Sequence, residues 1–276
     1  GVSYEAVDPG EYKVTLFSDK LVSPTRLRLT PDRQHLLVSQ ITGELLSFDR
    51  TATGWNNTPY LVTRVDTKFP GFPPDEAGLT GIILSKNFDK NGKLFLLYTY
   101  KDKNGKIQNR ISLTLIQEKN GKLKGVSPKL IYQANIAGAA SHQIADGVSL
   151  DVDGKPHLAF SIGEGFDGKR AQDPNLEGGK IILIQEDGSN PLGKRPYNNP
   201  KIEALGIRNP HVIVNNPDDK NRFLIADTGP DKYDRLIYTK LGSGEKLNFG
   251  WDGDQEKLKN PIPDPNNLMI KDMVIY

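Results

Sequence analysis

The sequence predicts an all-β fold, a β-propeller of four-stranded blades, from two observations. A strand–turn–strand pattern recurs along the chain, and helical periodicity over ten or more residues is absent. The recurring turns contain Pro31, Asn91, Asp153 and Asp218, which are spaced 60, 62 and 65 residues apart. Residues of these types favour the tight turns of β-hairpins. Four-stranded all-β units at a fixed period are typical of propeller blades.

Each unit begins with a predicted hairpin, and further strands follow. The hairpins pair apolar segments across the four turns: 27–30 with 35–39, 82–84 with 94–98, 148–150 with 157–161, and 212–214 with 223–226. Further strands are expected at 43–48, 110–117 and 180–185. Because these short apolar segments are bounded by Gly, Asp and Asn, they favour strands over helices.

The length of the chain limits the number of blades. The period leaves room in 276 residues for little more than four blades, so either the propeller is small or the chain stops before the ring closes. The apolar ending at 273–276 favours the second interpretation. A pair of β-sandwiches is the alternative architecture, but the regular period argues against it. We therefore expect one propeller domain over residues 1–276 that lacks its last blades.

Composition excludes several classes of function. The net charge is +2 and no stripe of Lys or Arg stands out, so nothing indicates a nucleic-acid partner. No apolar run approaches the roughly 18 residues of a transmembrane segment. The absence of cysteine excludes disulfides and thiolate metal sites without excluding an exported protein. Gly1 as the first residue is consistent with a removed export signal, so we expect a periplasmic or extracellular location.

The four histidines are the first candidates for chemistry. His35 and His157 lie inside predicted strands, where a structural role is favoured, and His211 is left undecided. His142 lies in a loop of small residues just before a predicted strand, where its imidazole can face a pocket. The ordinary pKa of imidazole, about 6.5, suits proton abstraction near neutral pH.

Charged residues at the ends of neighbouring strands complete the candidate site. Glu164 follows the strand after the His142 loop, at what should be the same rim of the sheet, and could orient the imidazole. The alternative is a solvated glutamate in a turn. Glu76 precedes the second hairpin in a similar way.

Two loops rich in Gly and Pro could bind ions. Arg208 and Asn209, between Gly206 and Pro210, could bind a planar anion through the guanidinium. The main-chain carbonyls of the loop at 228–230 could bind a hard cation such as calcium. Each signal is weak alone, and their common placement at strand ends is the stronger observation.

In their order along the chain, these motifs resemble the soluble glucose/sorbosone dehydrogenases, also called aldose sugar dehydrogenases, that use pyrroloquinoline quinone (PQQ). The matching segments are EAGLTGI at 76–82, 87–99, HQIADG at 142–147, SIGE at 161–164, GGKI through DGSNP at 178–191, GIRNP at 206–210, and GP at 229–230 with NFGW at 248–251. The resemblance covers roughly residues 20–252.

The resemblance implies a six-bladed propeller with its site at the mouth of the central channel. His142 would be the general base that removes the proton from a sugar anomeric hydroxyl as hydride passes to PQQ. Glu164 would orient His142, and Glu76 would lie near the substrate. The partners would be a small sugar and an electron acceptor, with the oligomeric state left open.

The resemblance also implies how the cofactors are held. Arg208 and Asn209 would contact the quinone and its developing negative charge. Gly229 and Pro230 would offer main-chain carbonyls to a calcium ion that bridges to PQQ.

The sequence departs from the family pattern in four places. The His142 loop is longer than the usual His-x-Gly-Gly, Glu164 stands at an aspartate position, and Thr228 replaces a metal-binding side chain of some members. After Trp251 nothing matches the basic residues of the last two blades that grip the quinone carboxylates. The sequence is therefore expected to be a fragment or a member that has lost the cofactor. A second hypothesis is a non-catalytic propeller that binds carbohydrate or protein at the same rim.

Overall fold

The computed structural model describes residues 15–135, 139–231, 233–259 and 268–270. The described strands form four sheets in chain order, and helices within these ranges are limited to short pieces. The helical pieces are α1 (Phe88–Asn91), η1 (Gly168–Gln172) and η2 (Gln255–Lys259). None of them has the length and apolar content that a membrane span requires. The prediction of an all-β chain is confirmed.

The four main strands of each sheet form an antiparallel meander, so each sheet corresponds to one blade. The first blade consists of β1 (Pro24–Leu29), β2 (His35–Gln40), β3 (Glu44–Thr51) and β5 (Tyr60–Arg64), with β4 (Gly54–Trp55) extending β3. The second consists of β6 (Leu79–Leu84), β7 (Lys93–Lys101), β8 (Ile107–Lys119) and β10 (Lys129–Asn135), with β9 (Lys122–Gly125) on β8.

The third and fourth blades follow the same plan. The third consists of β11 (Ile144–Val152), β12 (Lys155–Ile162), β13 (Lys180–Gln185) and β14 (Ile202–Leu205). The fourth consists of β15 (Pro210–Asn216), β16 (Asp219–Asp227), β17 (Arg235–Lys240) and β19 (Leu268–Ile270). A late strand, β18 (Leu247–Asn248), returns to pair in parallel with β14 of the third blade.

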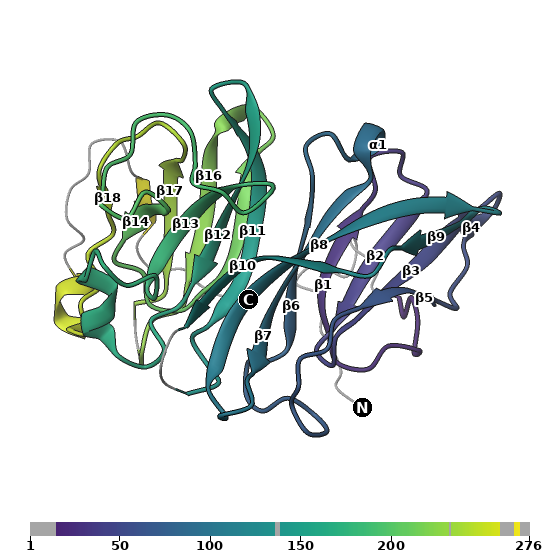
Figure 1. Cartoon of the computed structure of the whole chain (residues 1–276), viewed down its shortest axis with the longest axis horizontal. Coiled ribbons are helices and arrows are strands. Elements are labelled where there is room, and N and C mark those ends of the chain that lie inside the picture. The colour runs from purple at the N-terminus through teal and green to yellow at the C-terminus, as the bar shows by residue number, and fades with distance from the viewer. Residues whose placement is uncertain (1–14, 136–138, 232, 260–267, 271–276) are drawn as a thin grey trace.

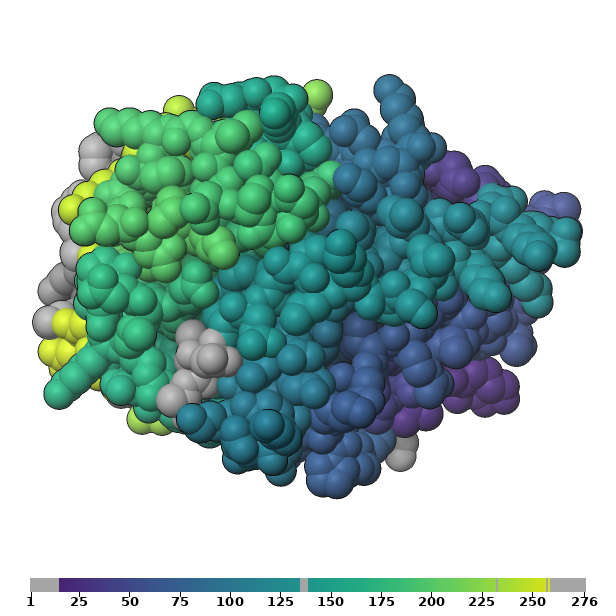
Figure 2. Space-filling view, in the orientation of Figure 1, coloured from purple at the N-terminus to yellow at the C-terminus, as the bar shows by residue number. Residues whose placement is uncertain are grey.

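The first strands of the blades lie side by side around a common axis. β1 contacts β6, β6 contacts β11, and β11 contacts β15. Figure 1 shows the first blade on the right, the second in the centre, and the third and fourth on the left. Figure 2 shows the blades meeting in chain order on this face. The four predicted turns all join the first strand of a blade to its second, as the propeller interpretation requires, and this arrangement rules out the sandwich alternative.

The core lies between the blades, which explains the uninterrupted apolar runs in the central strands. Successive side chains of a strand point to opposite faces. Leu94 and Leu96 of β7 therefore pack toward the first blade, while Phe95 and Leu97 pack toward the third. Since both faces are buried, no polar alternation survives in β7, and the same holds for residues 181–184 of β13.

Candidate active site

The candidate residues lie on loops at one end of the blades, and the strand directions explain why. In an antiparallel hairpin, the start of the first strand and the end of the second lie at the same end. Glu76 precedes β6, His142 precedes β11, and Arg208 precedes β15. Glu164 follows β12, and Gly229 follows β16. Because the first strands are neighbours around the axis, all five loops meet at one rim of the ring.

His142 and Glu164 form a buried pair at this rim. Nδ1 of His142 lies 2.7 Å from Oε1 of Glu164, and both side chains are almost fully buried. Gly163 permits the close approach of the two loops, since a Cβ at this position would lie 2.6 Å from the carbonyl carbon of His142. The second carboxylate oxygen of Glu164 is buried and has no hydrogen-bond partner within the described ranges. Within the described ranges the imidazole of His142 makes its hydrogen bond through Nδ1, so Nε2 is the ring nitrogen that can contact another molecule.

Glu76 connects the His142 loop to the fourth blade. Its carboxylate accepts a hydrogen bond of 2.9 Å from the backbone N–H of His142. It also accepts bonds of 3.1 and 3.2 Å from the side-chain amide of Asn209. Nε2 of His211, which the sequence left undecided, lies 3.6 Å from the same carboxylate. The structure therefore brings together residues from three successive blades.

An exposed aromatic ring covers the imidazole of His142. Phe166 stacks on it with ring centroids 3.9 Å apart and planes 18° from parallel. Phe166 and His142 both have positive φ angles, 65° and 56°, as does Asp75 beside Glu76, at 52°. Such backbone is sterically costly outside glycine, by about 1–3 kcal/mol per residue, and tends to cluster at functional sites.

The other two histidines have structural partners. Nδ1 of His35 lies 2.7 Å from Asp49. Nδ1 of His157 donates to the carbonyl of Lys155, at 2.8 Å, and its Nε2 accepts from the N–H of Leu192. Both rings are buried inside blades, in agreement with the interpretation from the sequence.

A buried ion pair fixes the loop that carries Arg208 and Asn209. The carboxylate of Asp227 accepts the backbone N–H groups of Arg208, at 3.0 Å, and of Asn209, at 2.8 Å. Asp227 is itself paired with Arg235, whose guanidinium also donates to the carbonyls of Gly206 and Phe249. Sequence reasoning missed the role of Asp227. It lies directly before the loop at 228–230, but only the fold shows that its carboxylate faces residues 18 and 19 positions earlier.

The carbonyls expected to bind calcium face the Arg208 side chain instead. Nη1 of Arg208 donates to the carbonyls of Thr228, at 3.0 Å, and of Gly229, at 2.8 Å. Pro230 is half-buried. The described residues contain no cluster of three or more His, Asp or Glu side chains that could ligate a metal. The guanidinium of Arg208 therefore occupies the Thr228 and Gly229 carbonyls in this structure, and a cation could use them only after Arg208 moves away.

The donors around Arg208 do fit an anionic planar ligand. The Arg208 guanidinium lies 5.9 Å from the ring centre of Trp251, which is a cation–π contact. The indole N–H of Trp251 is buried and lacks a hydrogen-bond partner among the described residues. An anion such as the quinone expected from the sequence could be held by Arg208 and Asn209.

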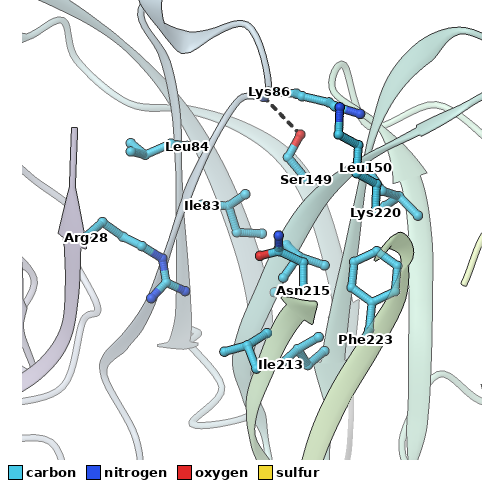
Figure 3. A pocket seen from close by; sticks show the side chains of 13 residues that line it. Arg28, Ile83, Leu84, Lys86, Ser149, Leu150, Ile213, Asn215, Lys220 and Phe223 are labelled. Carbon is cyan, nitrogen blue, oxygen red and sulfur yellow. Dashed lines mark hydrogen bonds between the residues drawn. The ribbon is translucent and has the colours of Figure 1, made fainter. Parts of the chain in front are cut away.

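Two cavities lie between the first strands of the blades. One, of about 200 Å³, is lined by Glu76, Asn209 and His211 among others, so it belongs to the candidate site. The other, of about 470 Å³, has apolar walls that include Ile213 and Phe223 (Figure 3). None of the predicted site residues lines the larger cavity.

A charged cluster separates the two cavities. Buried Asp146 of β11 pairs with Arg28, at 2.8 Å, and with Arg26, at 3.4 Å. Arg26 lines the smaller cavity and Arg28 the larger one. Arg26 also donates to the carbonyls of Thr80 in β6 and His211 in β15. This cluster, which we name the axial cluster, therefore joins the first strands of all four blades.

The fold and the site define a class of protein: β-propellers with a buried histidine–carboxylate pair at one rim. Within that class, the chain belongs to the Glucose / Sorbosone dehydrogenase family, whose model matches residues 21–259. It is 24% identical over 247 residues to Aldose sugar dehydrogenase YliI of Escherichia coli (strain K12), covering 88% of this chain and 62% of that protein.

Solved structures share the fold. The PQQ-bound aldose sugar dehydrogenase of Streptomyces coelicolor matches with a TM-score of 0.67 and 22% identity, over 87% of this chain and 66% of that one. The apo form of the soluble aldose sugar dehydrogenase of Escherichia coli matches with a TM-score of 0.66 and 21% identity, over 86% and 65%. The chain thus spans just under two thirds of the length of these relatives, which agrees with four blades against the six that the resemblance implies.

Proposed function

We propose that the chain carries the proton-abstracting site of a PQQ-dependent oxidoreductase that oxidises the anomeric hydroxyl of an aldose to the lactone. The observation that carries this proposal is the buried imidazole of His142, which contacts the carboxylate of Glu164 through Nδ1 and so has Nε2 as its second nitrogen for chemistry. Membership of the Glucose / Sorbosone dehydrogenase family supports the substrate class and the quinone.

The proposed chemistry follows from the proton on His142. With Nδ1–H donating to Glu164, Nε2 carries the lone pair and is the general base. Nε2 takes the proton of the anomeric hydroxyl, the anomeric carbon loses its hydrogen as hydride, and a carbon–oxygen double bond forms. Bound PQQ supplies the two-electron acceptor for that hydride. Glu164 stabilises the imidazolium of His142 until Nε2 releases the abstracted proton to solvent.

The other predicted residues have positioning roles in this proposal. Arg208 and Asn209 would hold the anionic quinone, the first as the charged group and the second as an amide donor. The carboxylate of Glu76 is partly exposed at the mouth of the smaller cavity, where it could accept hydrogen bonds from sugar hydroxyls. The partners would be a sugar and an electron acceptor, in the periplasm or outside the cell.

Calcium binding by the main-chain carbonyls of Gly229 and Pro230 stays a prediction, and it requires a movement of Arg208. The Arg208 guanidinium has to leave the Gly229 carbonyl before a cation can use it. The variant Arg208→Gln, which removes the competing charge, should then bind calcium at least about tenfold more tightly than the wild type in titration calorimetry. Arg64→Gln, at an exposed pair, is the control. Equal calcium affinities in Arg208→Gln and wild type would contradict a site at this loop.

Reconstitution tests the proposed function. The full chain is incubated with PQQ and calcium, and dye reduction is followed with a panel of mono- and disaccharides. Aldose-dependent reduction that disappears in His142→Ala supports the proposal. Sugar binding with no quinone-dependent reduction by any member of the panel would overturn it in favour of a non-catalytic carbohydrate-binding propeller.

A further inference from the structure

We propose that the larger of the two cavities is a binding site for a small organic carboxylate with an apolar body. The body of the ligand would lie among the apolar side chains of the strands, and its carboxylate would meet the cationic side chains that line the same cavity. None of the predicted site residues lines this cavity, so the inference goes beyond the proposed function and does not depend on it.

The place of the larger cavity in the fold is the first observation. The first strands of the second, third and fourth blades start at the rim that carries His142, and the cavity is lined by residues nearer their other ends, such as Leu84 of β6. Its volume of about 470 Å³ lies in the range of about 300–1,000 Å³ that is usual for small-molecule sites. A ligand in this cavity would therefore lie apart from the proposed substrate, on the other side of the axial cluster.

The walls of the larger cavity are mostly apolar. The apolar side chains that line it come from four strands, β6, β11, β15 and β16, and include Ile83, Leu150, Ile213 and Phe223 (Figure 3). Val214, which also lines the cavity, is 43% exposed. Covering this surface with an apolar ligand removes it from water, which favours binding.

The charged groups that line the larger cavity are all cationic, which is the second observation. They are Arg28, Lys86 and Lys220, and no Asp or Glu is among the described residues that line it. Figure 3 shows Arg28 on one side of the cavity and Lys220 and Phe223 on the opposite side. An anion inside the cavity therefore has cationic groups on both sides.

Neighbouring carboxylates neutralise Arg28 and Lys86 only in part. Arg28 shares the carboxylate of Asp146 with Arg26, so two guanidiniums meet one carboxylate and the axial cluster keeps one positive charge. Lys86 has a partner of its own in Asp151, at 2.5 Å. The axial cluster therefore supplies an excess of positive charge to the cavity, whereas the pair of Lys86 supplies none.

Lys220 adds a second positive charge. It is exposed, and no ion pair joins it to a carboxylate of the described ranges. Asp218 and Asp219 come directly before it in the chain, but neither lines the cavity, and Asp219 lies 3.8 Å from Arg222. The ammonium of Lys220 is therefore available to a ligand.

An organic carboxylate matches both the walls and the charges. Attraction between charges is stronger beside apolar walls than in bulk water, because the local dielectric is lower. Ser149 can add a hydrogen bond, since its hydroxyl accepts the N–H of Lys86, at 3.0 Å, and keeps its own proton to donate. A small inorganic anion would leave the apolar walls uncovered, and a neutral ligand would leave the cations without a partner.

Titration calorimetry of the full chain with 1-naphthoate tests the site. We expect binding with a Kd below about 1 mM. The uncharged analogue 1-naphthalenemethanol should bind at least about tenfold more weakly, and acetate at the same concentration should not displace 1-naphthoate. Equal affinities for 1-naphthoate and its alcohol, or no binding of 1-naphthoate, would overturn the inference.

Variants identify the groups that hold the carboxylate. Lys220→Gln should weaken 1-naphthoate binding about three- to fivefold, and Val214→Asp, which places a negative charge on the wall, at least about fivefold. Both residues are exposed, so the Tm should not change. The controls are Lys103→Gln, at an exposed lysine of the second blade, and Arg208→Gln, which detects binding at the candidate active site. A wild-type affinity in Lys220→Gln or Val214→Asp, or a loss in Arg208→Gln alone, would contradict the proposal.

A single introduced thiol locates the ligand, because the chain contains no cysteine. Asn215→Cys places the thiol at an exposed position that lines the larger cavity. Saturating 1-naphthoate should slow its reaction with uncharged 4,4′-dithiodipyridine at least about fivefold. Asn104→Cys, at an exposed turn of the second blade, should react at the same rate with and without 1-naphthoate. If bound 1-naphthoate leaves the rate of Asn215→Cys unchanged, the ligand lies elsewhere and the inference is wrong.

Discussion

His142 is held by two carboxylates in different ways, and the difference separates their roles. Glu164 contacts the imidazole at Nδ1, whereas Glu76 contacts only the backbone N–H of the same residue. The first contact acts on the proton chemistry, because it fixes which ring nitrogen carries the proton. The second fixes the loop and leaves the ring untouched.

Replacing His142 with Ala is expected to lower kcat for the proposed aldose oxidation about 10²–10⁴-fold, the typical contribution of a general base. PQQ binding should stay largely intact. Glu164→Gln should have a milder effect, because the amide oxygen still accepts the Nδ1–H bond while the charge is lost. Steady-state dye-reduction rates and quinone binding by fluorescence quenching check both expectations. Unchanged sugar oxidation in His142→Ala would show that another group takes the proton.

Lys180 gives the stability of the protein a pH dependence. Its ammonium is buried and donates to the carbonyls of Arg170 and Gly178, at 2.6 and 2.7 Å. Burial removes water from the charge and lowers the pKa of Lys180 from 10.5 to about 8. Between these two pKa values the unfolded chain binds more protons than the folded one, so the contribution of Lys180 to stability rises with pH across this window and is smallest below pH 8.

The variant Lys180→Met tests this effect. The unfolding free energy of the wild type relative to the variant should increase between pH 8 and pH 10 by up to about 1.4 kcal/mol per pH unit. Urea denaturation at several pH values measures the difference. The exposed Lys68, replaced by Met, is the control. A constant difference across the window would mean that Lys180 is not titrating as its burial implies.

The histidine–glutamate pair could be predicted from the sequence, and the other contacts of the site could not. The start of the first strand and the end of the second strand of a blade lie at the same rim. The placement of His142 before the one and Glu164 after the other therefore follows from the blade period. By contrast, the contact of Asn209 with Glu76 spans 133 residues and depends on how the second and fourth blades face each other across the ring. The stacking of Phe166 on His142 depends on a left-handed backbone at Phe166, which could not be expected from the sequence because this residue is not glycine.

At the scale of elements, the loop before β15 depends on the end of β16. The Asp227 carboxylate at the end of β16 accepts two backbone N–H groups of this loop, while Arg235 of β17 neutralises the carboxylate. A strand of the fourth blade therefore sets the position of the guanidinium and amide at the candidate site.

Asp227→Asn is expected to lower the unfolding free energy by about 3 kcal/mol, because it leaves the buried guanidinium of Arg235 without its counter-charge. The matched control is Asp151→Asn, which breaks a half-exposed pair with Lys86 and should cost less than about 1 kcal/mol. Chemical denaturation of the three proteins measures both values. Similar losses in the two variants would contradict a special role for the buried pair.

The strands themselves were predicted well because both faces of the central strands are apolar. The segment predicted at 180–185 agrees with β13 at both ends. The predicted segments 82–84 and 148–150 were shorter than β6 and β11, which begin three and four residues earlier. Gly, Thr and Asp in those first residues interrupt the apolar pattern, because the axial cluster takes polar residues where a core would take apolar ones.

For the molecule as a whole, the axial cluster matters because it contacts the first strands of all four described blades. Asp146→Asn is expected to lower the unfolding free energy by about 3 kcal/mol, since it leaves the guanidiniums of Arg26 and Arg28 without their carboxylate. Hydrogen exchange should accelerate in β1 and β15 as well as in β11, because the cluster reaches each of them. Acceleration confined to the third blade would mean that the cluster does not connect the ring.

The pairing of β18 with β14 has a consequence for how the protein is made. β14 ends at Leu205, but the strand that covers its edge begins at Leu247, after most of the fourth blade in the chain. A ribosome adds about 5–20 residues per second, so the edge of the third blade stays open for some seconds after it has been synthesised. During that interval nascent chains on neighbouring ribosomes expose the same unpaired strand. We therefore expect the yield of folded protein to depend strongly on conditions that keep nascent chains apart, such as a chaperone or a low density of ribosomes on the mRNA. We expect it to depend less on the unfolding free energy of a completed blade.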